Sequence, residues 1–135
     1  MAQRGDEYTV SLKLPHLNWG DYRNETNRDV IHDEGYIPIP RKYAKEFDIF
    51  NSNNLDTGLG YNLFYASSLD GFLNNVPLLA QGSQRAKDIY AKQFSVQGDL
   101  KMIGKWYQSQ SATLEDSVHV RWTSPTEIIL EIVRM

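Results

Sequence analysis

The side chains best suited to a chemical task lie in one long polar stretch between Asn18 and Glu34. Two arginines and three asparagines stand out in it, namely Asn18, Arg23, Asn24, Asn27 and Arg28. An arginine can donate two hydrogen bonds to one guanine, and an asparagine can pair with the edge of adenine. A polar connection of this length in a compact domain usually has a function. The stretch therefore predicts base recognition in duplex DNA.

The rest of the chain must position this stretch, and most of it has the pattern of β-strands. Apolar and polar residues alternate from Tyr8 to Leu14, which is the period of a half-buried strand. Further strands are expected at the following places: an extended segment over Gly35–Ile39, strands at Tyr61–Tyr65 and Phe72–Ala80, and a closing hairpin of Ser117–Trp122 and Thr126–Val133. Pro77 is expected to break its strand or to confine it to a sheet edge, because proline cannot donate to a β-ladder.

Two helices are expected. Pro40 suits the start of a short helix over Arg41–Glu46. A second helix is expected over Leu100–Ser109, with Asp99 as its N-cap and Trp106 packed in the core. This order of elements favours a mainly β (α+β), barrel-like fold with one or two short helices, and the length of 135 residues favours a single domain over 1–135.

Four segments of the chain resemble a known family. They are LNWG at 17–20, GYIPIP at 35–40, GDLKMIGKWYQSQ at 98–110 and SVHVRWTSPTEIILEIV at 117–133. Together they are similar to the B3-like pseudobarrel DNA-binding domains of type II restriction endonucleases, of the NgoFVII C-terminal type, to which plant B3 domains are related. The resemblance implies a seven-stranded DNA-binding pseudobarrel that grips the major groove with two arms. The first arm would be Asn18–Asp33 and the second Gln81–Gln97.

The resemblance also implies which residues contact double-stranded DNA. In the first arm these are Asn18, Arg23, Asn24, Asn27 and Arg28; in the second they are Gln81, Ser83, Gln84, Arg85, Lys87 and Lys92. The expected function is sequence-specific recognition within a restriction-modification system. Cleavage would then belong to a separate nuclease domain or subunit, and this chain needs no cofactor of its own.

The charge of the chain argues against strong general attraction to DNA. The formal net charge is −3, and Pro15–Glu34 carries two arginines against five acids. Nucleic-acid binders usually carry a basic surface. Few phosphates would be neutralised, so non-specific binding should be weak and its salt dependence shallow. The absence of cysteine fits a reducing cytoplasm, and neither a signal peptide nor a membrane span is expected.

No catalytic or metal-binding motif is predicted. None of the three histidines precedes a lysine by two residues, as the phospholipase-D-type nucleases fused to such domains require. The single acid-x-lysine pair, Asp99 and Lys101, is better explained by a helix cap. Two alternatives stay open: a small metal-dependent hydrolase or nuclease using acids of the polar stretch, and a protein-interaction domain whose acidic arm mimics DNA.

Overall fold

Residues 1–13, 35–51, 56–82 and 89–134 are described by the computed structural model, and within them the chain forms seven strands and two helices. The strands are β1 (Glu7–Ser11), β2 (Ile37–Pro38), β3 (Leu63–Ser68), β4 (Val76–Gln81), β5 (Gln93–Val96), β6 (Ser117–Ser124) and β7 (Glu127–Val133); the helices are α3 (Arg41–Glu46) and α4 (Met102–Ser109). All seven strands belong to one sheet, in the order β1-β6-β7-β3-β4-β5-β2. The predicted mainly β fold with two short helices is confirmed.

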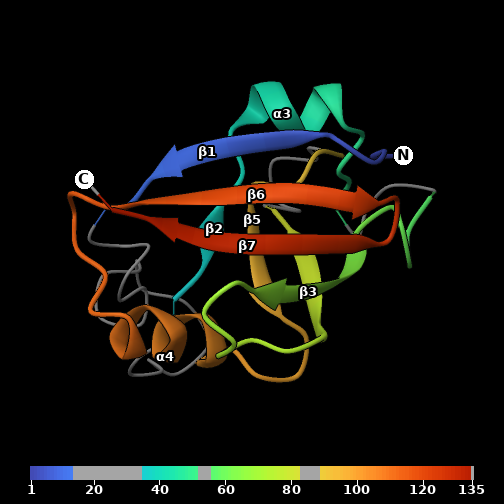
Figure 1. Ribbon diagram of the computed structural model, residues 1–135. Helices are drawn as coiled ribbons and strands as arrows, with labels where there is room; N and C mark the ends of the chain where they lie inside the picture. The colour runs from blue at the N-terminus through green and yellow to red at the C-terminus, as the bar shows by residue number, and fades with distance from the viewer. Residues whose placement is uncertain (14–34, 52–55, 83–88, 135) are drawn as a thin grey trace, which may run out of the picture.

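The sheet curls into a half-barrel, which brings its two edge strands together (Figure 1). All neighbouring strands are antiparallel except β3 and β7, which run parallel. Across the seam between the edges, the hydroxyl of Tyr8 on β1 donates to the carbonyl oxygen of Pro38 on β2 at 3.0 Å. A side chain, rather than a backbone ladder, therefore links the first strand of the sheet to the last.

A second tyrosine bonds the backbone just before β2, the edge strand that pairs only with β5 in the described structure. The hydroxyl of Tyr107 on α4 donates to the carbonyl oxygen of Tyr36 at 2.8 Å. Pro38 has no N–H, so its position at this edge leaves no donor without a partner there.

Tyr8 and Tyr107 are both buried, and burial raises the pKa of both phenols well above the usual value because it disfavours the charged form. Tyr8 and Tyr36 raise the pKa of Tyr107 further.

These raised pKa values predict a loss of stability in alkali. Below about pH 10 both phenols are neutral in the folded and the unfolded chain, so their contribution is intact. Above that pH the unfolded chain releases protons that the folded chain retains, and each phenol lowers the free energy of unfolding by up to about 1.4 kcal/mol per pH unit. Urea unfolding followed by tryptophan fluorescence between pH 8 and 11 measures this slope.

Single substitutions separate the two phenols from other groups that titrate in alkali. Tyr107→Phe and Tyr8→Phe should each remove the share of one phenol from this slope, while Tyr36, whose pKa burial also raises, keeps its own share. Each substitution should also cost about 1–3 kcal/mol at neutral pH, because a carbonyl loses its buried donor. Tyr65→Phe changes a tyrosine that is 40% exposed and serves as the control. Equal alkaline slopes in all four proteins would contradict the assignment.

Trp122 on β6 lies at the centre of the core. Its ring contacts those of Tyr8, Phe47, Phe64 and Phe94, with centroid distances of 5.6–6.4 Å. These residues come from β1, the end of α3, β3 and β5, so one side chain joins distant parts of the chain. Burial of large aromatic surface of this kind is a main source of folding free energy.

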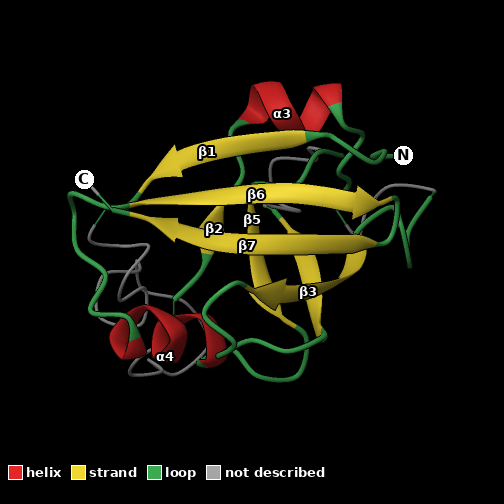
Figure 2. Cartoon of the chain, in the orientation of Figure 1, coloured by secondary structure: helices red, strands yellow, loops and turns green. Residues whose placement is uncertain are grey.

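The two helices lie on opposite sides of the curled sheet (Figure 2). α3 has the predicted bounds, and the ring of its Tyr43 stacks on that of Tyr8 with a centroid distance of 5.3 Å. α4 buries Trp106 completely, as predicted, and its indole Nε1 donates to Asp70 after β3 at 2.8 Å. The helices therefore close the half-barrel from two directions.

The prediction that Pro77 marks a sheet edge or a broken strand is wrong. β4 lies inside the sheet, between β3 and β5. Pro77 pairs with Tyr65 of β3, and its carbonyl oxygen accepts from Gln97 N at 2.8 Å. The register of β4 with β5 begins one residue later, at Leu78. The N–H that Pro77 lacks would therefore lie at the end of the β4–β5 ladder, where its absence interrupts no pair.

The second helix begins later than predicted, at Met102 instead of Leu100, and Asp99 is not its N-cap. The N-cap residue is Lys101, which makes no side-chain capping bond. The Asp99 carboxylate instead accepts from Lys101 N at 3.1 Å, which forms a turn before the helix. Turn bonding of this kind competes with the first helical turn.

The predicted strands also differ from the described ones in their bounds. β2 is Ile37–Pro38, where Gly35–Ile39 was expected, and β4 is Val76–Gln81, where Phe72–Ala80 was expected. β6 continues two residues beyond Trp122, and β7 begins one residue after Thr126. β1 is described over Glu7–Ser11, where Tyr8–Leu14 was expected. β3 begins at Leu63 and continues to Ser68, through part of the turn expected after Tyr65. The reason lies at Gly58, whose carbonyl oxygen accepts from the N–H groups of residues 61, 62 and 63. That turn delays the start of the strand.

Candidate nucleic-acid interface

Two of the predicted DNA-contacting residues, Gln81 and Lys92, belong to the described structure. The others lie outside the described residues: Asn18, Arg23, Asn24, Asn27, Arg28, Ser83, Gln84, Arg85 and Lys87. The described part of the predicted interface is therefore the base of the second arm, formed by Gln81 and Lys92.

Gln81 and Lys92 lie next to each other at that base. Gln81 is the last residue of β4, and Lys92 immediately precedes β5. The N–H of Lys92 donates to the carbonyl oxygen of Gln81 at 2.7 Å, and both residues are exposed. The β4–β5 pairing thus brings together two residues that are eleven positions apart and leaves both side chains accessible.

Gly82 holds this base close to a neighbouring segment. Its N–H donates to Asn51 Oδ1 at 3.1 Å. A Cβ at position 82 would lie 3.1 Å from the carbonyl oxygen of Tyr90 and 3.4 Å from Lys92 N. Only glycine allows this approach without displacement, so Gly82 keeps the end of β4 close to Tyr90 and Lys92.

The ring of Tyr90, two residues before Lys92 in the sequence, contacts another ring and two cations. Residues 50 and 90 form a β-bridge, and the rings of Phe50 and Tyr90 stack at 5.8 Å. Two cations of α3 lie over the Tyr90 ring, with Arg41 Cζ at 5.8 Å and Lys45 Nζ at 6.0 Å from its centroid. Such contacts are attractive and restrain the cationic side chains. Basic groups therefore gather next to the second arm.

The α3 cations are not among the residues predicted to contact DNA. The predicted helix over Arg41–Glu46 is present, and Ala44 and Phe47 are buried on its inner side. The available signal was the spacing of Arg41 and Lys45, which places them one turn apart on a helix face. Their contact with the ring of Tyr90 was not visible in the sequence, because it depends on pairings between distant segments.

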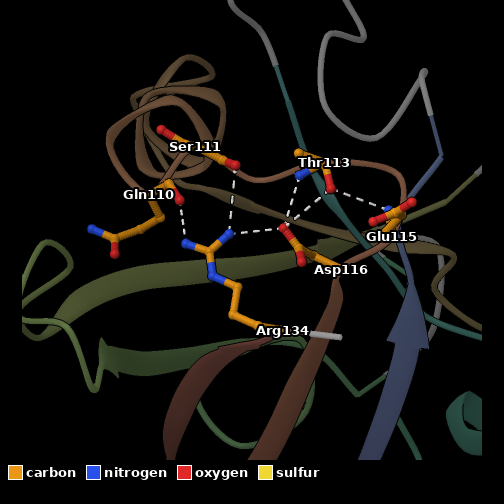
Figure 3. A network of polar contacts seen from close by, with 6 residues as sticks. All are labelled: Gln110, Ser111, Thr113, Glu115, Asp116 and Arg134. Carbon is orange, nitrogen blue, oxygen red and sulfur yellow. Dashed lines mark hydrogen bonds and ion pairs between the residues drawn. The ribbon is translucent and has the colours of Figure 1, made fainter.

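A second polar cluster joins the end of α4 to the hairpin of β6 and β7 (Figure 3). Arg134 donates to the carbonyl oxygens of Gln110 and Ser111 and to Asp116 Oδ2, the last at 2.8 Å. The same Asp116 oxygen accepts from Thr113 N at 2.9 Å. The bond from Thr113 N lowers the pKa of Asp116 against the effect of burial, and Arg134 lowers it further. These contacts all lie within the protein, so the cluster stabilises the packing of the end of α4 against the residues that flank β6 and β7.

The described residues contain no cluster of metal ligands. Within residues 1–13, 35–51, 56–82 and 89–134, no group of three or more histidine, aspartate or glutamate side chains could hold a metal ion. His119 lies 3.4 Å from Glu7 across β6 and β1, as an isolated pair. The absence of catalysis stays a prediction from the missing motifs. The described helices are also too short and too polar to cross a membrane.

Comparison with known proteins identifies no family for this chain. No protein-family model matches it, and no curated protein matches it. Its relation to the B3-like domains remains a prediction from the four sequence segments.

Proposed function

We propose that this protein is a sequence-specific double-stranded DNA recognition module that lacks nuclease activity of its own. The observation that carries the proposal is the juxtaposition of Gln81 and Lys92. Both are exposed, and a 2.7 Å backbone hydrogen bond joins them where the predicted second arm leaves the sheet. A glutamine amide suits a base edge and a lysine ammonium suits a phosphate.

The fold and the local charge support this proposal. The curled seven-stranded sheet with two helices agrees with the architecture that the resemblance implies. The chain is acidic overall, yet Arg41 and Lys45 of α3 lie over the ring of Tyr90, two residues before Lys92. A local basic surface is what a phosphate backbone requires. The restriction-modification role, with cleavage by a separate nuclease, rests on the resemblance alone and forms part of the proposal.

Selection from a randomised duplex pool at low salt tests the proposed function. The wild-type chain should enrich a defined sequence. Lys92→Ala should then weaken binding to the selected and to a scrambled duplex by the same factor, and should lower the slope of log K against log salt by about one. Lys105→Ala, at an exposed position of α4, serves as the matched control and should leave both the affinities and the slope unchanged.

The other outcomes point to the alternative functions. A pool without enrichment contradicts sequence-specific recognition. Metal-dependent cutting that disappears when one acid of this chain is replaced would identify a nuclease. Failure to bind any duplex, together with stoichiometric binding to a nuclease subunit, would identify an acidic interaction domain.

A further inference from the structure

We propose that α3 is a third DNA-contacting element, which binds backbone phosphates independently of sequence through Lys42 and Lys45, with Arg41 alongside. The inference rests on the proposed function and deepens it, because the two predicted arms do not include this helix. Its partner is the phosphate backbone of the duplex held at the second arm.

The first support is the continuity of α3 with the base of that arm. The carbonyl oxygen of Lys92 accepts from Ile39 N at 2.8 Å, and α3 begins two residues after Ile39. Lys92 N is bonded at the same time to Gln81. Lys92 is therefore held between the strand that ends in the second arm and the segment that leads into α3.

The second support is the placement of the α3 cations around aromatic rings. Lys45 Nζ lies 6.0 Å from the centroid of Tyr90, and Lys42 Nζ lies 5.3 Å from that of Tyr43. A side chain that is already restrained loses less conformational entropy when it binds. Aromatic contacts of this kind prepare the two lysines for a phosphate at little further cost.

The third support is the charge. α3 carries three of the fourteen basic residues of the chain within six positions, against one acid, Glu46. In the described part of the chain, Lys42, Lys45 and Lys92 belong to no ion pair. A solvated helix face needs no such bias in a chain whose net charge is −3, whereas a phosphate-binding surface does.

The test uses charge-removing and charge-retaining variants of the same two lysines. The double variant Lys42→Gln/Lys45→Gln is compared with Lys42→Arg/Lys45→Arg. The matched control is Lys101→Gln/Lys105→Gln, which removes two exposed lysines at α4, on the other side of the sheet (Figure 1). Binding to the selected and a scrambled duplex is measured by fluorescence anisotropy between 50 and 200 mM salt. Thermal melting checks that each variant is folded.

The glutamine variant should lower the slope of log K against log salt by about two, since each lost phosphate contact removes about 0.9. Both duplexes should be weakened by the same factor, so the ratio of their affinities stays that of the wild type. The arginine variant should keep the wild-type slope, and so should the α4 control.

Each remaining outcome decides one of the two proposals. If the wild type selects a sequence and the α3 glutamine variant keeps the full slope, α3 is not a contact. An equal loss in the α4 control would attribute the effect to net charge and would also overturn the inference. If no sequence is selected but the α3 variant still loses the slope, specific recognition fails and the phosphate contact stands. If the wild type binds no duplex, both fail.

Discussion

Replacing Trp106 with alanine is expected to lower the free energy of unfolding by about 3–5 kcal/mol, the range for large aromatic truncations in cores. Trp106 is completely buried in α4, and its ring stacks on Tyr107 at 5.5 Å. The loss of this contact should also weaken the sheet edge, because the hydroxyl of Tyr107 donates a hydrogen bond to the carbonyl oxygen of Tyr36. Urea unfolding monitored by circular dichroism measures the change.

The indole N–H of Trp106 makes part of this contribution. It donates to Asp70 Oδ2, while Asp70 Oδ1 accepts from Ser68 Oγ and Phe72 N. Partial burial raises the pKa of Asp70, but these bonds outweigh it, with Ser68 the strongest, and the net pKa is lowered. The lowered pKa favours the ionised form of Asp70, and a hydrogen bond from Trp106 to a carboxylate is stronger than one to a neutral acceptor.

Trp122 provides a matched control for that hydrogen bond. It is as buried as Trp106, but within the described structure its Nε1 has no hydrogen-bond partner. Trp106→Phe and Trp122→Phe remove the same ring atoms, and only the first removes a hydrogen bond. Trp106→Phe should therefore cost about 1–3 kcal/mol more than Trp122→Phe, as for bonds to charged groups. Equal costs would show that the bond to Asp70 contributes nothing.

Arg23→Ala and Arg28→Ala are expected to flatten the base preference of the selected duplex. Each lost arginine–guanine pair should cost about 1–3 kcal/mol and relax one position of the target. Both residues lie outside the described structure, so the expectation comes from the sequence: a stretch rich in arginine and asparagine with five acids is poorly suited to general attraction and better suited to discrimination.

The measurement compares each arginine variant with Lys92→Ala on cognate and scrambled duplexes at two salt concentrations. The arginine variants should lose the affinity ratio, whereas Lys92→Ala should lose affinity for both duplexes alike. A full cognate-to-scrambled ratio in both arginine variants would show that the first polar stretch does not read bases. The resemblance to the restriction-endonuclease domains would then fail as a guide to the site.

Short-range patterns in the sequence predicted most of the local elements. The alternation at Ser117–Trp122 and Thr126–Val133 predicted the β6–β7 hairpin, and Pro40 with the following apolar spacing predicted α3 to the residue. The burial of Trp106 followed from its position on the apolar face of a helix. These features succeed because side-chain period and proline geometry act within a few residues.

The tertiary structure alone decided how these elements meet. β3 pairs in parallel with β7, more than sixty positions away, and β4 lies inside the sheet despite Pro77. The hydrogen bond of Ile39 to Lys92 places the α3 cations beside the second arm. Local periodicity does not specify such pairings, because they follow from the burial of faces contributed by segments far apart in the chain. The residue types that suit DNA were therefore evident in the sequence, while the placement of Arg41 and Lys45 over the ring of Tyr90 arises from the fold.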